Sequence, residues 1–178
     1  MYYIGIDLGT SSTKMLLLDE QGVIHAEVAH DYPLEFPQPG WSQQDPAHWW
    51  QAVKKGMPQL LKGIDAGSVA GIGVAGQMHG LVVLDESDNI IRPAILWNDG
   101  RTAKQVEYLN NEIGKEKLSA MTANIAFAGF TAPKILWMRD EEPENFAKIA
   151  KIMLPKDYIN YVLTDVHACD YSDASGML

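Results

Sequence analysis

The first fourteen residues of the chain, Met1-Tyr2-Tyr3-Ile4-Gly5-Ile6-Asp7-Leu8-Gly9-Thr10-Ser11-Ser12-Thr13-Lys14, decide how the rest of it is interpreted. Their apolar and aromatic opening predicts a buried strand, and the apolar run over residues 15–18 predicts a second strand. A short Gly-Thr-Ser-Ser turn lies between the two. The carboxylate of Asp7 therefore stands directly before a turn that is rich in hydroxyl groups.

This turn has the chemistry of a phosphate site. Gly9 lets the backbone approach a ligand closely. The N–H groups and hydroxyls of Thr10, Ser11 and Ser12 can donate to phosphate oxygens, and Asp7 can hold Mg²⁺ directly or through water. Such a set suits phosphoryl transfer, which depends mainly on positioning and charge neutralisation. The alternative is an ordinary hairpin with a Gly-Thr-Ser turn and a capping aspartate.

The composition is that of an acidic globular chain. A length of 178 residues with 47% hydrophobic and 21% charged residues fits one domain with a substantial core, or part of something larger. The net charge of −9 argues against a nucleic-acid-binding surface. The single cysteine, Cys169, excludes an internal disulfide and a cysteine-based metal site. No signal-peptide pattern or membrane-length apolar run is present, so we expect a cytoplasmic protein without a membrane partner.

The remaining pattern predicts an α/β fold. Residues 23–30 predict the third strand of an antiparallel meander, and the proline-rich residues 32–42 predict a loop. Asp45-Pro46 predicts a helix start, with a kink or early end near Pro58. Further candidate strands cover residues 69–75, 81–84 and 151–154, and an apolar run over residues 90–97, interrupted at Arg92-Pro93, ends just before Asn98. Candidate helices cover residues 102–113, 115–121, 132–139, 142–148 and 155–163. Residues 170–178 predict a polar turn. This order indicates a mixed sheet flanked by helices.

The glycines of residues 71–76 match the dinucleotide fingerprint Gly-x-Gly-x-x-Gly, but their context argues against that function. A true fingerprint turns from a strand into a helix, whereas these glycines lie within a strand-like run that is followed by another strand. Small residues that allow close backbone packing are the favoured interpretation. A dinucleotide-binding protein would require a helix directly after Gly76.

Two further clusters stand at predicted strand ends, where α/β folds place ligand-binding groups. His79, preceded by Met78, offers an imidazole that can hydrogen-bond a sugar hydroxyl or act as a base. Trp97, Asn98 and Asp99 combine an indole wall with amide and carboxylate groups, which suits a polyol. The alternatives are a half-buried histidine bonded to a carbonyl, and a turn in which Asn-Asp-Gly supplies unusual backbone angles while the indole lies in the core.

Three other side chains are expected to be structural or solvated. Trp41, in the proline-rich loop, is expected to be a packing anchor. Lys134 and Lys156 each follow a proline near a predicted helix start, and either could reach an anion. We expect both to be ordinary surface lysines.

Five motifs, in this order, resemble those of the FGGY carbohydrate kinases, and within that family those of the members that phosphorylate D-xylulose. They are Gly5-Ile6-Asp7-Leu8-Gly9-Thr10-Ser11-Ser12, Gly76-Gln77-Met78-His79-Gly80, Ile95-Leu96-Trp97-Asn98-Asp99-Gly100-Arg101, Gly129-Phe130-Thr131-Ala132-Pro133-Lys134 and Leu154-Pro155-Lys156-Asp157-Tyr158. The resemblance implies an actin-like, ribonuclease-H-type fold. It also implies that ATP and Mg²⁺ bind in a cleft between two such domains, and that the first domain holds most of the sugar.

Carried over residue by residue, the resemblance makes Asp7 the acidic residue near Mg²⁺ and the transferred phosphoryl group. The implied phosphate turn comprises Gly9, Thr10, Ser11, Ser12 and Lys14. The implied sugar pocket is lined by Met78, His79, Trp97, Asn98 and Asp99. The Met-His pair stands where glycerol kinases have Arg-Glu, which favours a ketopentose such as D-xylulose.

The resemblance also implies a second domain. The family's catalytic base is an aspartate of that domain, which also binds the adenosine, so residues 1–178 are expected to be the N-terminal, sugar-binding domain and to be inactive alone. L-ribulose, gluconate and glycerol are the alternative substrates, and the family's habit of dimerising suggests a homodimer. A non-catalytic, actin-like binding or assembly module is the alternative from another functional class.

Overall fold

The computed structural model describes residues 1–178 and is built around a four-stranded mixed sheet with the strand order β3-β2-β1-β5. The strands are β1 (Tyr2–Leu8), β2 (Ser12–Asp19), β3 (Ile24–Asp31) and β5 (Val69–Gly76). β1, β2 and β3 form an antiparallel meander, and β5 joins β1 in parallel. The predicted meander and the predicted mixed sheet are both confirmed.

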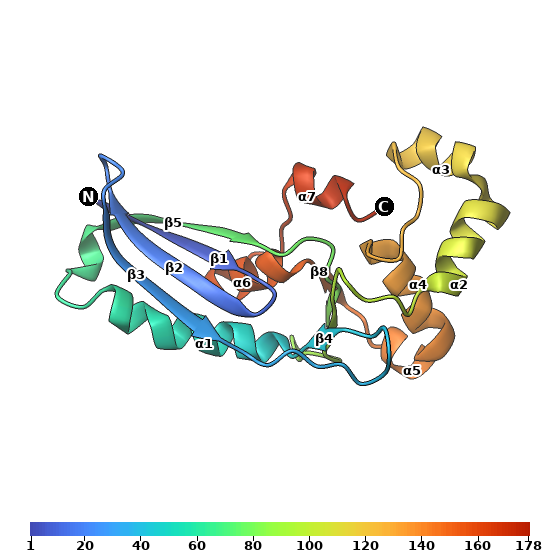
Figure 1. Ribbon diagram of the computed structural model, residues 1–178, viewed down its shortest axis with the longest axis horizontal. Coiled ribbons are helices and arrows are strands. Elements are labelled where there is room, and N and C mark those ends of the chain that lie inside the picture. Colours follow the sequence, from blue (N-terminus) through green and yellow to red (C-terminus); the bar gives the residue numbers. More distant parts are fainter.

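One face of the sheet forms the main core. Alternation along β1 and β2 points a set of apolar side chains to this face, all of them at most 3% exposed: Ile4, Ile6, Leu8, Met15 and Leu17. Helix α1 (Pro46–Leu60) packs on β2 and β3, and helix α6 (Pro155–Thr164) packs on β5. The two helices also contact each other, so they cover this face as one layer (Figure 1).

Helix α1 begins where the sequence predicts and ends later than expected. The side chain of Asp45 accepts a hydrogen bond from the N–H of Ala47 at 2.8 Å, as an N-cap does. The expected early end near Pro58 is wrong, because the helix continues to Leu60, and the alternative of a kink there stays a prediction. Trp49 and Leu60 are both fully buried against the sheet. Burial of this apolar face outweighs the loss of one helical hydrogen bond at the proline.

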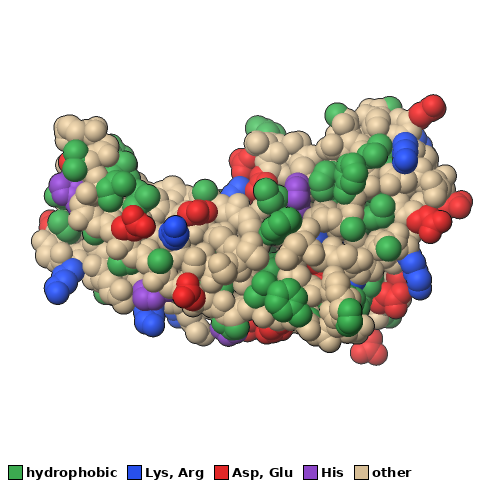
Figure 2. Space-filling view, in the orientation of Figure 1, with side chains coloured by type: hydrophobic (Ala, Val, Ile, Leu, Met, Phe, Trp, Pro, Cys, Tyr) green, Lys and Arg blue, Asp and Glu red, His purple; other side chains and the backbone are tan.

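The opposite face of the sheet has no covering element among residues 1–178. Tyr3 is 40% exposed on this face, and Asp7 is exposed as well. Figure 2 shows the outline of the molecule hollowed between the β2–β3 hairpin and helix α7 (Tyr171–Ser175), above the sheet. The carboxyl end of β1 is therefore accessible from this side.

A second layer extends beyond the carboxyl ends of β1 and β5 (Figure 1). It contains the strand pairs β4 (Gln43–Gln44) with β7 (Ala94–Ile95) and β6 (Val82–Leu84) with β8 (Lys151–Met153). Its helices are α2 (Ala103–Glu107), the π-helical turn Tyr108–Gly114, α3 (Lys115–Thr122), α4 (Thr131–Glu141) and α5 (Pro143–Phe146). Trp137 and Met138 of α4 pack on Leu81, Val83 and Ile95. This small core holds the loops that follow β5 and β7.

The structure refines three element predictions. The predicted helix over residues 102–113 is a short α-helix that passes into a π-helical turn. The predicted polar turn over residues 170–178 contains helix α7, because the side chain of Asp170 caps it by accepting from the N–H of Asp173 at 2.9 Å. The glycines of residues 71–76 lie within β5, and no helix follows Gly76, which removes the dinucleotide-binding interpretation. None of the helices combines the length and apolar character that crossing a membrane requires.

Candidate phosphate and sugar site

In the turn between β1 and β2, three carbonyl groups are bonded within the protein and two N–H groups are not. The hydroxyl of Tyr32 donates to the carbonyl of Gly9, and Gln44 Nε2 donates to the carbonyl of Thr10 at 2.6 Å. The N–H of Tyr32 donates to the carbonyl of Ser11 at 3.2 Å. No protein group accepts from the N–H groups of Thr10 and Ser11. Neighbouring free N–H groups of this kind can bind an anion.

A fully buried amide supports this turn. Gln44 donates to the turn through Nε2, and its Oε1 accepts from Trp49 Nε1 at 3.0 Å and from Gln77 Nε2 at 3.2 Å. Gln77 directly precedes Met78, and its N–H donates to the carbonyl of Leu8 at 2.8 Å. One buried network therefore joins the β1–β2 turn to the start of the loop that carries Met78.

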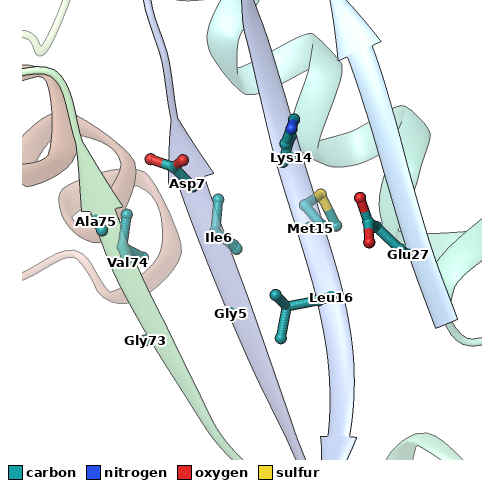
Figure 3. A pocket seen from close by; sticks show the side chains of 10 residues that line it. All are labelled: Gly5, Ile6, Asp7, Lys14, Met15, Leu16, Glu27, Gly73, Val74 and Ala75. Carbon is teal, nitrogen blue, oxygen red and sulfur yellow. The ribbon is translucent and has the colours of Figure 1, made fainter. Parts of the chain in front are cut away.

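Asp7 and Lys14 stand on the open side of this turn. They are paired across β1 and β2, both are exposed, and neither makes an ion pair or a side-chain hydrogen bond. Figure 3 shows both at one end of a hollow of about 470 Å³ on the uncovered sheet face, with Leu16 and Gly73 farther along it. Because the Asp7 carboxylate has no protein partner, it can ligate a divalent cation or a water of its hydration shell.

Trp97 joins the predicted sugar cluster to the turn. Its indole Nε1 donates to the hydroxyl of Thr10 at 3.1 Å, although the two residues are far apart in the sequence. The ring of Trp97 is 43% exposed, and the side chain of Met78 is 48% exposed. Asn98 is also exposed. An open apolar wall thus lies beside the candidate phosphate turn.

Asp99 supports the loop of Trp97 from within the protein. It is only 2% exposed, and its oxygens accept from the N–H of Ser42 at 2.6 Å and from Arg101 Nη2 at 2.7 Å. The guanidinium of Arg101 stacks on Trp41, 3.9 Å from the ring centroid, so Trp41 is the packing anchor that its sequence context predicts. With these bonds in place, contact between Asp99 and a sugar stays a prediction.

His79 is held in an unusual conformation at the end of this region. Its φ is 60°, in the left-handed region that non-glycine residues seldom adopt. Its ring lies against Phe130, with 4.7 Å between the centroids. Burial, together with the nearby charge of Lys134, lowers the pKa of His79 below its usual value. The neutral imidazole is therefore favoured at neutral pH, and the backbone of Gly176 lies beside its Nδ1.

The two proline-following lysines differ from the expectation. Lys134 is 0% exposed, so its prediction as a surface lysine is wrong: its Nζ donates to the carbonyls of His79 at 2.7 Å and Gly129 at 2.8 Å. Lys156 is largely buried too and forms ion pairs with Asp157, Asp170 and Asp173 at 2.6, 2.8 and 3.1 Å. Sequence reasoning also missed Gln44, because only the folded chain brings its partners together.

The chain resembles sugar kinases over its whole length. Residues 2–178 match the model of the FGGY family of carbohydrate kinases, N-terminal domain. The xylulose kinase of Escherichia coli (strain K12) is 45% identical over 176 residues, which cover 99% of this chain and 36% of that protein. A solved "xyloylose kinase" from Brucella ovis matches with a TM-score of 0.93 at 40% identity, over 99% of this chain and 37% of that one.

A gluconate kinase from Lactobacillus acidophilus has a TM-score of 0.92 at 30% identity, over 99% of this chain and 36% of that one. The match to these kinase structures confirms the actin-like, ribonuclease-H-type fold expected from the resemblance. The chain spans little more than a third of the length of the relatives that it matches.

Proposed function

The chain belongs to the FGGY family of carbohydrate kinases, and from that membership we propose that it is the sugar-binding domain of an ATP-dependent kinase that phosphorylates D-xylulose. Two relatives named above, the Escherichia coli and Brucella ovis proteins, support D-xylulose as the substrate. The gluconate kinase also matches the chain, but at a lower sequence identity of 30%, so gluconate is kept as the alternative substrate.

The hydrogen bond between Trp97 and Thr10 is the observation that carries this proposal. It places the wall on which a sugar would lie directly beside the turn that would hold a phosphoryl group. Phosphoryl transfer gains most of its rate from bringing the two reactants together in the correct orientation. If the sugar wall and the phosphate turn were only loosely connected, the two reactants would not be held in a fixed orientation.

The residues of the turn have the properties that Mg²⁺ and a nucleotide tail need. Asp7 offers a carboxylate without a protein partner, and the N–H groups of Thr10 and Ser11 are free. Bound Mg²⁺ would neutralise charge on the phosphate oxygens. Asp7 would orient the cation, the free N–H groups would hold phosphate oxygens, and Lys14 would add a positive charge at the rim of the hollow.

The sugar side would use one apolar and several polar contacts. The ring of Trp97 offers the face on which the carbon skeleton of a ketopentose can lie. His79, favoured as the neutral imidazole, can hydrogen-bond a hydroxyl, and the exposed side chains of Met78 and Asn98 border the same region. The proton of the reacting hydroxyl would pass to an aspartate of a second domain, as the family resemblance implies.

Substrate specificity can be tested in a chimera in which residues 1–178 replace the matching part of the Escherichia coli xylulose kinase. The chimera is assayed for ATP-dependent phosphorylation of D-xylulose, L-ribulose, gluconate and glycerol. We expect the highest kcat/KM with D-xylulose. A folded chimera that prefers another substrate, or that transfers phosphate to none, contradicts the proposal. Circular dichroism melting establishes that the chimera is folded.

A further inference from the structure

Lys134 is buried in a manner that simple packing does not explain. Its side chain is 0% exposed, on the first turn of helix α4, and it forms no ion pair with any carboxylate. Its ammonium donates to two backbone carbonyls instead, those of His79 and Gly129. An ammonium group without a carboxylate partner is costly to bury, because it gives up its hydration shell. A methionine would fill the same space without that cost.

Lys156, which has the same sequence context, is stabilised in the usual way for a partly buried lysine, by pairing with carboxylates. Both lysines follow a proline and lie in the first turn of a helix. Lys156 is surrounded by three carboxylates, which raise its pKa despite partial burial. Burial lowers the pKa of Lys134 to about 7, with Asp99 opposing the shift and Arg101 adding to it. The ammonium group of Lys134 therefore depends on two carbonyl acceptors, where that of Lys156 has three carboxylates.

Both acceptors belong to loops that form the candidate sugar region. The carbonyl of His79 also accepts from the hydroxyl of Thr131 at 3.1 Å, so two donors on α4 hold a residue with a left-handed φ of 60°. Gly129 packs so tightly on Trp97 that a Cβ there would lie 2.7 Å from the Trp97 carbonyl oxygen. A single ammonium thus fixes the loop of His79 against the loop that supports Trp97.

We propose that Lys134 is a positioning residue for sugar binding: it sets the spacing between His79 and Trp97 by holding the carbonyls of His79 and Gly129 together. This inference rests on the proposed sugar-binding function. It differs from a purely structural role, because loss of the ammonium would displace the His79 loop while leaving the phosphate turn, held by Gln44 and Tyr32, in place.

The first readout is local and needs no sugar. The His79 ring lies against Phe130, so its ring protons should be displaced by the ring current in the proton NMR spectrum of the chain. In Lys134→Met that displacement should largely disappear, while the signals of the remote His25 stay unchanged. Lys104→Met, on the exposed surface of α2, is the matched control and should change neither set of signals. Unchanged His79 signals in Lys134→Met overturn the inference.

The second readout is sugar affinity, measured by NMR titration of the chain with D-xylulose. We expect Lys134→Met to raise the Kd at least tenfold, and Lys104→Met to leave it within twofold. If Lys134→Met does not fold, Thr131→Val removes the other donor to the His79 carbonyl at nearly constant volume, and it should raise the Kd about threefold. Wild-type affinity in a folded variant with displaced His79 signals overturns the positioning role. If the wild-type chain binds no D-xylulose, the proposed function fails and the sugar-positioning role fails with it, and changed His79 signals then show only that Lys134 holds the His79 loop.

Discussion

The indole N–H of Trp97 donates to the side-chain hydroxyl of Thr10 at 3.1 Å and so joins the loop after β7 to the turn between β1 and β2. The residues next to Trp97 and Thr10 in the sequence give no sign that these two side chains are in contact. The bond spans the boundary between the region assigned to the sugar and the region assigned to phosphate. Its strength is therefore the first quantity to measure.

A double-mutant cycle isolates this bond. Thr10→Val removes the hydroxyl at similar volume, and Trp97→Phe removes the N–H but keeps an aromatic ring. Because both groups are partly exposed, we expect a coupling of about 0.5–1.5 kcal/mol in the free energy of unfolding by urea. Additive effects of the two substitutions would show that the bond contributes nothing to the folded state.

Gln44 should matter far more to stability than its short strand suggests. Gln44→Leu leaves the carbonyl of Thr10 and the polar hydrogens of Trp49 and Gln77 without their buried partner. We expect a loss of about 2–4 kcal/mol in the free energy of unfolding, since each buried unpaired group costs roughly 1–3 kcal/mol. Gln51→Leu, on the exposed side of α1, is the same change and should stay within about 0.5 kcal/mol. Equal effects of the two variants would contradict the buried network.

Close backbone packing at Gly129 gives a steric prediction. A Cβ at Gly129 would lie 2.7 Å from the Trp97 carbonyl oxygen, whereas a Cβ at Gly73 would meet no atom within 4 Å. Gly129→Ala should therefore destabilise the chain by about 1–3 kcal/mol through overpacking. Gly73→Ala should be neutral or stabilise it by up to about 1 kcal/mol, because alanine restricts the unfolded chain. Thermal melting of the two variants makes the comparison, and a tolerated Gly129→Ala would place the two loops farther apart.

Lys134 predicts a specific dependence of stability on pH. Burial lowers its pKa from 10.5 to about 7, so between these values the unfolded chain binds more protons at this residue than the folded chain. The unfavourable contribution of Lys134 is fully present below pH 7 and disappears as the pH rises toward 10.5. The free energy of unfolding of the wild type, minus that of Lys134→Met, should therefore increase from pH 7 to pH 10. A constant difference would mean that the ammonium is solvated.

The parts of the fold that depend on local pattern could be predicted from the sequence. The alternation in the first thirty residues gives the meander, and Asp45-Pro46 gives the start of α1. The placement of residues 71–76 within β5 follows from the strand-like run around their glycines. The continuation of α1 past Pro58 could not be predicted, because burial of Trp49 and Leu60 against the sheet decides it.

The sequence was enough to predict which residues make up the candidate site. It was not enough to predict the contacts that hold them. The Gly-Thr-Ser-Ser turn, His79 and Trp97 each have recognisable chemistry. The burial of Lys134 and the network of Gln44 depend on carbonyls and amides supplied by distant segments, so no local pattern indicates them. The same holds for Asp99, whose buried pairing with Arg101 only the folded chain reveals.

Asp7→Asn, introduced into the chimera with the Escherichia coli xylulose kinase, tests the role of the β1–β2 turn most directly. The substitution keeps the size of the side chain and removes the charge that would orient Mg²⁺. We expect kcat for D-xylulose phosphorylation to fall at least a hundredfold, while the Kd for D-xylulose changes less than twofold. An Asp7→Asn chimera that keeps the kcat of its parent would show that no cation oriented by Asp7 takes part in the transfer, which contradicts the proposed site.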